Sequence, residues 1–168
     1  MYQVVHDWEE VHEVAGQQID VRVHTTASPA AVYGLLCDGA GWPTWSPIGS
    51  FELERPGSDE PEGVGAIRVF RTGRTTSRER VAERVPDRRF SYELLSGLPI
   101  RDYRADVDLT PDDRGTLIRW HSSFTAKVPG TGWIYRRALG RFITRTAEGL
   151  ATYAATLPTR TPDRPDPA

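Results

Sequence analysis

The chain has 168 residues, a formal net charge of −2 and a hydrophobic fraction of 38%. This length suits one domain with a sizeable core, and the near-neutral charge gives no overall field for nucleic acid or an anionic membrane. No apolar run is long enough to span a bilayer. Cys37 is the only cysteine and the N-terminus has no signal-peptide pattern, so we expect a cytoplasmic protein without nucleic-acid partners or integral membrane association.

The chain opens with a leader, residues 1–17, whose role the sequence leaves open. Trp8, Val11 and Val14 have roughly helical spacing, which permits a short docked helix, although a strand also fits. Apolar and polar residues then alternate over 18–26, which predicts a half-buried strand.

A short helix is predicted next, because Ser28 is a good N-cap and Pro29 suits the first helical position. The helix should end near Cys37. The glycine, tryptophan and proline residues of 39–47 permit at most one short helical turn.

Strand-like segments bounded by turn residues fill the middle of the chain. With the first strand they give about seven strands, and their short connections favour antiparallel neighbours. The predicted segments are 49–54, 65–71, 75–85, 88–96, 100–109 and 115–125.

One long amphipathic helix follows, because apolar residues recur at three- and four-residue steps from Tyr135 to Leu157. Thr131 is a candidate cap, and arginines occupy the opposite face. Pro158 ends the helix, and the proline-rich residues 158–168 are predicted to be a disordered tail.

Several local sequences, taken in this order, resemble the START-like (SRPBCC) superfamily, which includes the polyketide cyclase/dehydrase and lipid-transport families. The quoted segments are the helix entry ASPAAVY at 27–33, the aromatic turn WPTWSP at 42–47, the glycine turn EGVGA at 62–66, ERV at 79–81, and Gly115–Thr116 with Ile118 and Trp120. The likeness covers about residues 18–157. It implies an α+β helix-grip fold, in which a seven-stranded curved antiparallel sheet surrounds a long C-terminal helix, with a short helical segment after the first strand.

The resemblance also implies a ligand cavity between the sheet and the long helix. The apolar faces of the strands and of the helix are the candidate walls, because strand side chains alternate between two faces. Trp42 and Trp45 either line the mouth of this cavity or cover the core. The candidate ligand-binding residues are Trp42, Trp45, Glu79, Tyr92, Arg101, Tyr103, Trp120, Phe124, Tyr135, Leu139 and Phe142.

Three polar residues are candidates for catalysis: Glu79, Arg101 and Tyr103. Glu79 has the inward parity of Val81, which would place it inside and near Arg71 across the hairpin, as a general base or an anchor. The other interpretation, which we favour, is a structural or anchoring carboxylate held ionised by neighbouring arginines. Arg101 shares the parity of Tyr103 and could contact a ligand oxygen.

We expect no metal and no cofactor. His24 and His121 lie on the polar faces of neighbouring strands, but no third ligand has suitable spacing. Nucleophile-elbow, P-loop and dinucleotide-binding motifs are absent from the sequence.

Three functions remain open at this point. The first is non-covalent binding of a hydrophobic small molecule, such as a lipid, isoprenoid or polyketide, driven by roughly 25 cal/mol per Å² of apolar surface buried. The second is a polyketide cyclase or dehydratase that uses the same cavity. The third is a regulatory or interaction module. Ligand identity, catalysis and oligomeric state cannot be read from the sequence.

Overall fold

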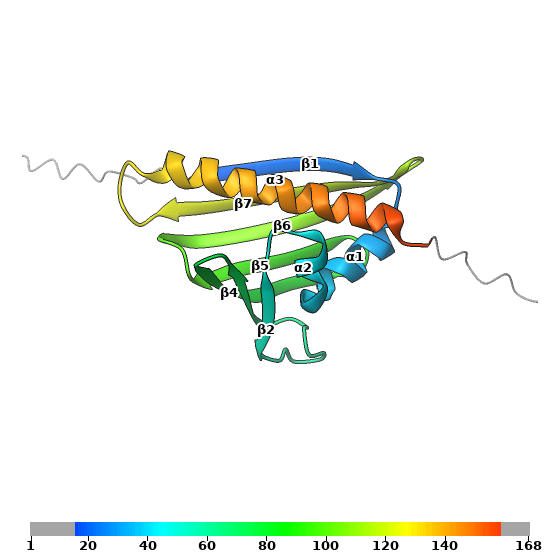
Figure 1. Cartoon of the computed structure of the whole chain (residues 1–168), viewed down its shortest axis with the longest axis horizontal. Coiled ribbons are helices and arrows are strands. Elements are labelled where there is room, and N and C mark those ends of the chain that lie inside the picture. The colour runs from blue at the N-terminus through cyan, green and yellow to red at the C-terminus, as the bar shows by residue number, and fades with distance from the viewer. Residues whose placement is uncertain (1–15, 159–168) are drawn as a thin grey trace, which may run out of the picture.

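The computed structural model describes residues 16–158, which form one curved antiparallel sheet with a long helix across it (Figure 1). The strand order is β1-β7-β6-β5-β4-β3-β2, so β1 and β2 are the edges. The strands are β1 (Gln17–Thr25), β2 (Ser50–Arg55), β3 (Ile67–Thr72), β4 (Thr75–Val85), β5 (Arg89–Ser96), β6 (Ile100–Asp112) and β7 (Gly115–Ala126). The helices are α1 (Pro29–Cys37), the single 3-10 turn η1 (Gly39–Gly41), α2 (Trp42–Trp45) and α3 (Gly132–Thr156).

This architecture confirms the predicted helix-grip fold. The short connections force antiparallel neighbours, and the one long connection, through α1, η1 and α2, carries the chain from one edge of the sheet to the other. The helix α3 runs along the concave side of the sheet, beside β1 and β7 (Figure 1). The leader and the tail fall largely on residues 1–15 and 159–168, outside the described part of the chain.

Local capping explains where the helices begin. The Ser28 hydroxyl accepts a hydrogen bond from the Ala31 amide at 3.3 Å, as its N-cap position predicts. Thr131 precedes α3, but its hydroxyl donates to the Val128 carbonyl at 2.7 Å and makes no capping bond to the helix. Thr131 therefore occupies the predicted N-cap position, but its side chain does not make the capping hydrogen bond.

The core is densest where α1, α2 and the C-terminal half of α3 meet the sheet. Val32, Leu36 and Leu150 are completely buried there. A Cβ on Gly149 would lie 1.9 Å from the Trp45 carbonyl oxygen, so only glycine allows this close approach of α3 to α2. This end of the interior is filled by side chains, which leaves the other end for a ligand.

Candidate functional site

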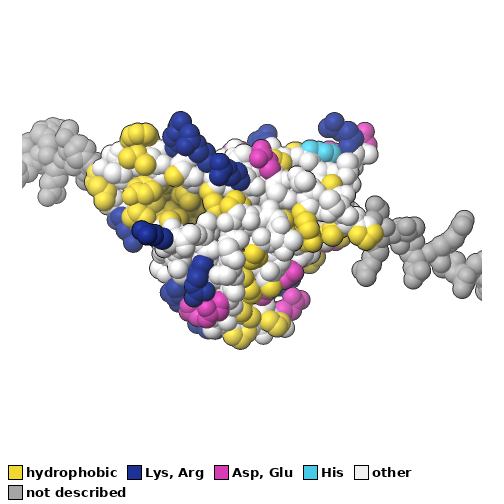
Figure 2. Space-filling view, viewed as in Figure 1, with side chains coloured by type: hydrophobic (Ala, Val, Ile, Leu, Met, Phe, Trp, Pro, Cys, Tyr) yellow, Lys and Arg dark blue, Asp and Glu magenta, His cyan; other side chains and the backbone are white. Residues whose placement is uncertain are grey.

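A cavity of about 340 Å³ lies under the N-terminal half of α3, against strands β3 to β6. Figure 2 shows hydrophobic side chains gathered around a hollow at this end of the molecule. The lining is mainly aliphatic and aromatic, with hydroxyl groups and one carboxylate as its polar points. The lining residues are Thr72, Thr75, Ser77, Glu79, Tyr92, Leu94, Leu98, Tyr103, Tyr135, Ala138, Leu139, Phe142 and Ile143.

The cavity brings together six of the eleven residues expected to bind ligand. Three come from the sheet and three from α3. They are Glu79, Tyr92, Tyr103, Tyr135, Leu139 and Phe142.

Four other candidates are buried in the core and do not line the cavity. Trp42 stacks on Phe70 with ring centroids 5.1 Å apart, and its indole N–H donates to the Leu36 carbonyl at 3.2 Å. Trp120 stands edge-on to Trp42 at 5.8 Å. Trp45 and Phe124 are also buried. The structure therefore supports the interpretation in which Trp42 and Trp45 cover the core.

Arg101 is exposed and does not share a face with Tyr103, which corrects the prediction from strand parity. The pairing of β6 with β7 shifts register between Arg101 and Arg104, and Asp102 has a left-handed backbone with φ of 55°. Such a bulge inserts a residue and rotates the next side chain to the other face. Tyr103 therefore points inward while Arg101 faces solvent.

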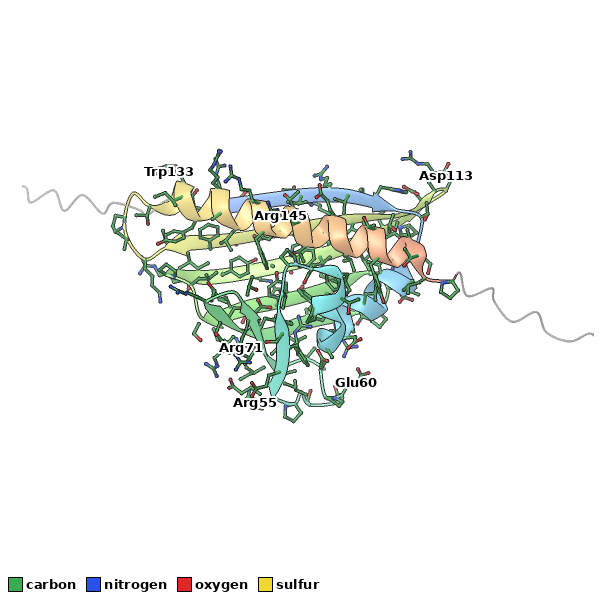
Figure 3. The ribbon with its side chains drawn as sticks, in the orientation of Figure 1. Arg55, Glu60, Arg71, Asp113, Trp133 and Arg145 are labelled. Atoms are coloured by element: carbon green, nitrogen blue, oxygen red, sulfur yellow. The ribbon has the colours of Figure 1, made fainter. Side chains whose placement is uncertain are left out.

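The arginine opposite Glu79 is Arg68 and not Arg71. Arg68 and Glu79 are direct partners in the β3–β4 ladder, whereas Arg71 pairs with Thr76. The Arg71 guanidinium donates to the carboxylate of Glu52, 3.2 Å away on the edge strand β2 (Figure 3). The expectation that Arg71 faces Glu79, and that surface arginines hold Glu79 ionised, is wrong.

Arg68 is completely buried, and the sequence analysis missed it. Its guanidinium carbon lies 4.8 Å from the ring centroids of both Trp42 and Phe90, in the geometry of cation–π contacts. One guanidinium nitrogen donates to the Leu36 carbonyl at 3.2 Å. The signal in the sequence was its parity with Phe70 on the inner face of β3.

The nearest carboxylate to Arg68 belongs to Glu62, in the glycine turn before β3. Glu62 Oε2 lies 3.6 Å from the Arg68 guanidinium, and both carboxylate oxygens accept from the Gly39 amide, at 2.9 and 3.1 Å. Burial raises the pKa of Glu62, and Arg68 opposes that rise. Glu62 thus ties the loop before β3 to η1 and to the buried arginine.

Among the described residues that line the cavity, Glu79 has the only charged side chain. Its Oε2 is buried and has no hydrogen-bond partner among the described residues. Burial raises the pKa of Glu79 to about 7, and the opposing effects of Arg68 and of the Ser77 hydroxyl are smaller. The carboxyl group can therefore exchange a proton near neutral pH.

Two tyrosine hydroxyls stay protonated beside it. The Trp120 indole N–H donates to the Tyr92 hydroxyl oxygen at 3.2 Å, and the Tyr92 hydroxyl in turn interacts with that of Tyr103. Burial raises the pKa of Tyr103 to about 12 and that of Tyr92 well above its usual range. Both are neutral donors at physiological pH.

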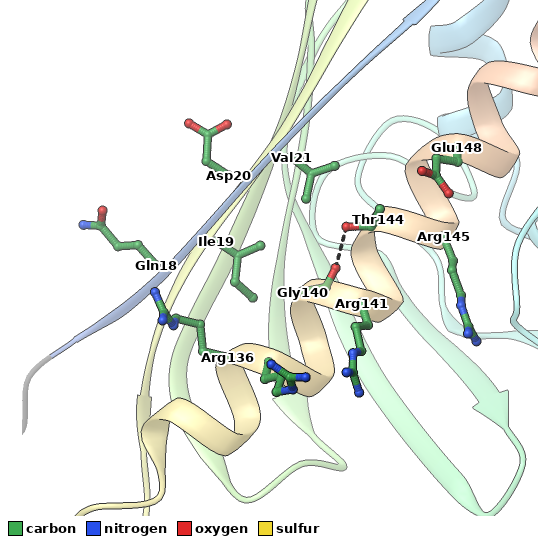
Figure 4. Close-up of a pocket in the computed structure, with 11 residues that line it drawn as sticks. Gln18, Ile19, Asp20, Val21, Arg136, Gly140, Arg141, Thr144, Arg145 and Glu148 are labelled. Atoms are coloured by element: carbon green, nitrogen blue, oxygen red, sulfur yellow. Dashed lines mark hydrogen bonds between the residues drawn. The ribbon is translucent and has the colours of Figure 1, made fainter.

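A second hollow, of about 680 Å³, is a surface groove between β1 and α3 (Figure 4). Four arginines of α3 line it: Arg136, Arg137, Arg141 and Arg145. Within residues 16–158 these arginines form no ion pair. The groove is polar and open, so it does not match the apolar cavity that the fold predicts.

The two histidines on the sheet are partners of aspartates. His24 Nε2 lies 3.0 Å from the Asp112 carboxylate, and His121 Nε2 lies 2.8 Å from Asp108. In the described part of the chain no three His, Cys, Asp or Glu side chains are grouped as metal ligands. No helix within residues 16–158 is long and apolar enough to cross a membrane.

Comparison with known proteins places this geometry in a family. The chain resembles a START superfamily protein from Mycobacterium smegmatis (15% identity, TM-score 0.72, 84% of this chain and 99% of that one). It also resembles a Thermobifida fusca protein (25% identity, TM-score 0.69, 86% and 97%) and the major latex-like protein 151 of Panax ginseng (11% identity, TM-score 0.66, 85% and 99%). Comparison with curated proteins gives no significant match. The profile of one family, described as polyketide cyclase / dehydrase and lipid transport, matches residues 16–155, and the chain belongs to that family.

Proposed function

We propose that this protein binds a hydrophobic small molecule, such as a lipid, isoprenoid or polyketide, in the cavity under α3. The observation that carries the proposal is the cavity itself, about 340 Å³ with a mainly aliphatic and aromatic lining. An apolar ligand in it would bury its surface against this lining, which is worth roughly 25 cal/mol per Å². The family and fold support hydrophobic ligands in general.

The lining explains how such a ligand would be held. Leu94, Leu98, Leu139, Phe142 and Ile143 supply apolar contact from the sheet, a loop and the helix. Burial of ligand surface against them provides the affinity, and the few polar groups fix the orientation. We also propose, from the composition of the sequence, that the protein is cytoplasmic and does not bind nucleic acid.

The test combines native mass spectrometry of freshly purified protein with a filled-cavity variant. Leu139→Trp adds volume at a cavity wall, and Leu95→Trp adds the same volume at an exposed leucine of β5. We expect a co-purifying small molecule in the wild type and in Leu95→Trp, and its loss in Leu139→Trp. Equal ligand occupancy in all three proteins would refute binding in this cavity.

A second function, a polyketide cyclase or dehydratase, is favoured by one observation. Glu79, with a pKa of about 7, faces the same cavity as the protonated Tyr92 and Tyr103. The carboxylate could accept a proton from a C–H group next to a ligand carbonyl, while a tyrosine hydroxyl stabilises the enolate oxygen that forms. Intact binding with lost turnover in Glu79→Gln would support this enzyme over a simple binder.

A further inference from the structure

The cavity contains an acceptor that the protein leaves without a partner. Oε2 of Glu79 is buried, bonded to none of the described residues, and belongs to a side chain that lines the cavity. A buried polar atom without a hydrogen bond costs about 1–3 kcal/mol, and more when it carries charge. The Ser77 hydroxyl acts on the same carboxyl from the cavity lining, and a ligand donor would add the hydrogen bond that Oε2 lacks.

The charges around this oxygen do not cancel. Arg68 supplies one positive charge to two carboxylates, those of Glu62, whose oxygen lies 3.6 Å from its guanidinium nitrogen, and of Glu79. No ion pair joins Arg68 to Glu79 among the described residues, although the two are ladder partners and attract each other at longer range. When Glu62 and Glu79 are both ionised, this end of the cavity carries one uncompensated negative charge.

Nothing else in the lining would balance a ligand anion. Apart from Glu79, the polar side chains that residues 16–158 contribute are hydroxyls, and none of these residues adds a lysine or arginine to the lining. The hydroxyls are those of Thr72, Thr75, Ser77, Tyr92, Tyr103 and Tyr135. A ligand carboxylate would meet the Glu79 carboxylate in a desolvated space without a countercharge. A ligand hydroxyl, phenol or amine would instead donate to Oε2.

We propose that the bound molecule is a hydrophobic compound whose polar end donates a hydrogen bond to Glu79, and that the cavity discriminates against hydrophobic carboxylic acids. This inference rests on the proposed binding function and narrows its ligand class. It favours alcohols, phenols and amines over free fatty acids. The acceptor is placed by β4, a central strand of the sheet, so its position is rigid.

The test compares three probes that share one alkyl chain: 1-decanol, decylamine and decanoic acid. In isothermal titration calorimetry at pH 8, decylamine and decanol should bind at least about tenfold more tightly than decanoate. A tenfold difference in affinity corresponds to the free energy of one hydrogen bond to a charged group. In Glu79→Gln the decanoate affinity should rise to within threefold of decanol, because the amide removes the charge and keeps the shape. Glu93→Gln, which removes a half-buried carboxylate of β5 that is paired with Arg80, should keep the wild-type order.

The outcomes separate this inference from the function on which it rests. Wild-type protein that binds all three probes equally, or Glu79→Gln that keeps the wild-type order, would overturn the donor assignment and leave hydrophobic binding intact. Wild-type protein that binds none of the probes, with no ligand in the native mass spectrum, would overturn both. A smaller penalty for decanoate at pH 5.5 than at pH 8 would support Glu79 as the discriminating group.

Discussion

The two ends of the interior differ in how closely their side chains pack, although the same helix, α3, covers both. The C-terminal half of α3 carries small residues, among them Ala147, Gly149 and Ala151, and lies close against α2. The N-terminal half carries Tyr135 and Phe142, which are only half-buried and stand around the cavity. The small side chains allow the close contact with α2, whereas the large ones line the cavity. The same helix therefore stabilises the fold at one end and shapes a binding site at the other.

If this division is correct, the largest losses of stability should come from the packed end. Trp120 is buried, contacts Trp42, and donates to the Tyr92 hydroxyl. Trp120→Ala should lower the free energy of unfolding by about 3–5 kcal/mol in urea titrations, because it removes a large core side chain. Trp133→Ala, at an exposed tryptophan on the outer side of α3 (Figure 3), is the matched control and should change stability little. A small loss in Trp120→Ala would mean that this end is not the one that holds the fold.

Arg68 lies where the packed end meets the cavity, and its removal should be nearly as costly. Arg68→Met keeps the aliphatic length but leaves Glu62 and Glu79 without their buried cation, which should cost about 3 kcal/mol at pH 8. Adding Glu79→Gln should recover part of that loss, because one of the two orphaned charges is then absent. Strictly additive losses in the double variant would contradict electrostatic coupling between these residues.

The cavity end should also give the protein an unusual dependence on pH. The pKa of Glu79 is raised in the folded state from 4.5 to about 7, so the folded protein holds this proton more tightly than the unfolded chain does. The corresponding stability is fully present below pH 4.5 and is lost as the pH rises through 7. Relative to Glu79→Gln, the wild type should lose on the order of 3 kcal/mol between pH 4.5 and 8.

Urea titrations of both proteins across this range would measure the difference directly. Because Glu62 and the surface carboxylates are common to both chains, their titration cancels in the comparison. A wild-type protein that gains stability over Glu79→Gln as the pH rises would show that Glu79 is ionised and well paired in the folded state.

The sequence predicted the fold well because alternation and turn residues are local signals. The site depended on register, which is not local. The turn at Gly73, whose φ is 58°, pairs Thr72 with Thr75, and counting back along both strands brings Arg68 opposite Glu79. The prediction put Glu79 near Arg71 without counting the register, and Arg71 lies three residues from the true partner. The bulge at Asp102 has no comparable sequence signature, so the wrong face for Arg101 followed from assuming regular alternation.

Parity also could not show whether an inward side chain fills space or lines it. Trp120 and Phe142 both have the inward parity of their elements, and both were predicted to bind ligand. The structure separates them: Trp120 is buried in the core, whereas Phe142 lines the cavity. This distinction leads to the smallest of the expected stability effects.

Phe142→Ala should reduce the free energy of unfolding by about 1 kcal/mol, well below the 3–5 kcal/mol typical of a buried phenylalanine. The side chain is half-buried and already borders open volume, so its loss creates little new unfilled space. Ligand binding should change more than stability, because the variant enlarges the cavity and removes an apolar wall. Unfolding in urea of Phe142→Ala beside Phe90→Ala, a completely buried phenylalanine of β5, would measure the contrast. Equal losses in the two variants would show that the cavity end is as tightly packed as the rest, and the proposed binding site would then lose its physical basis.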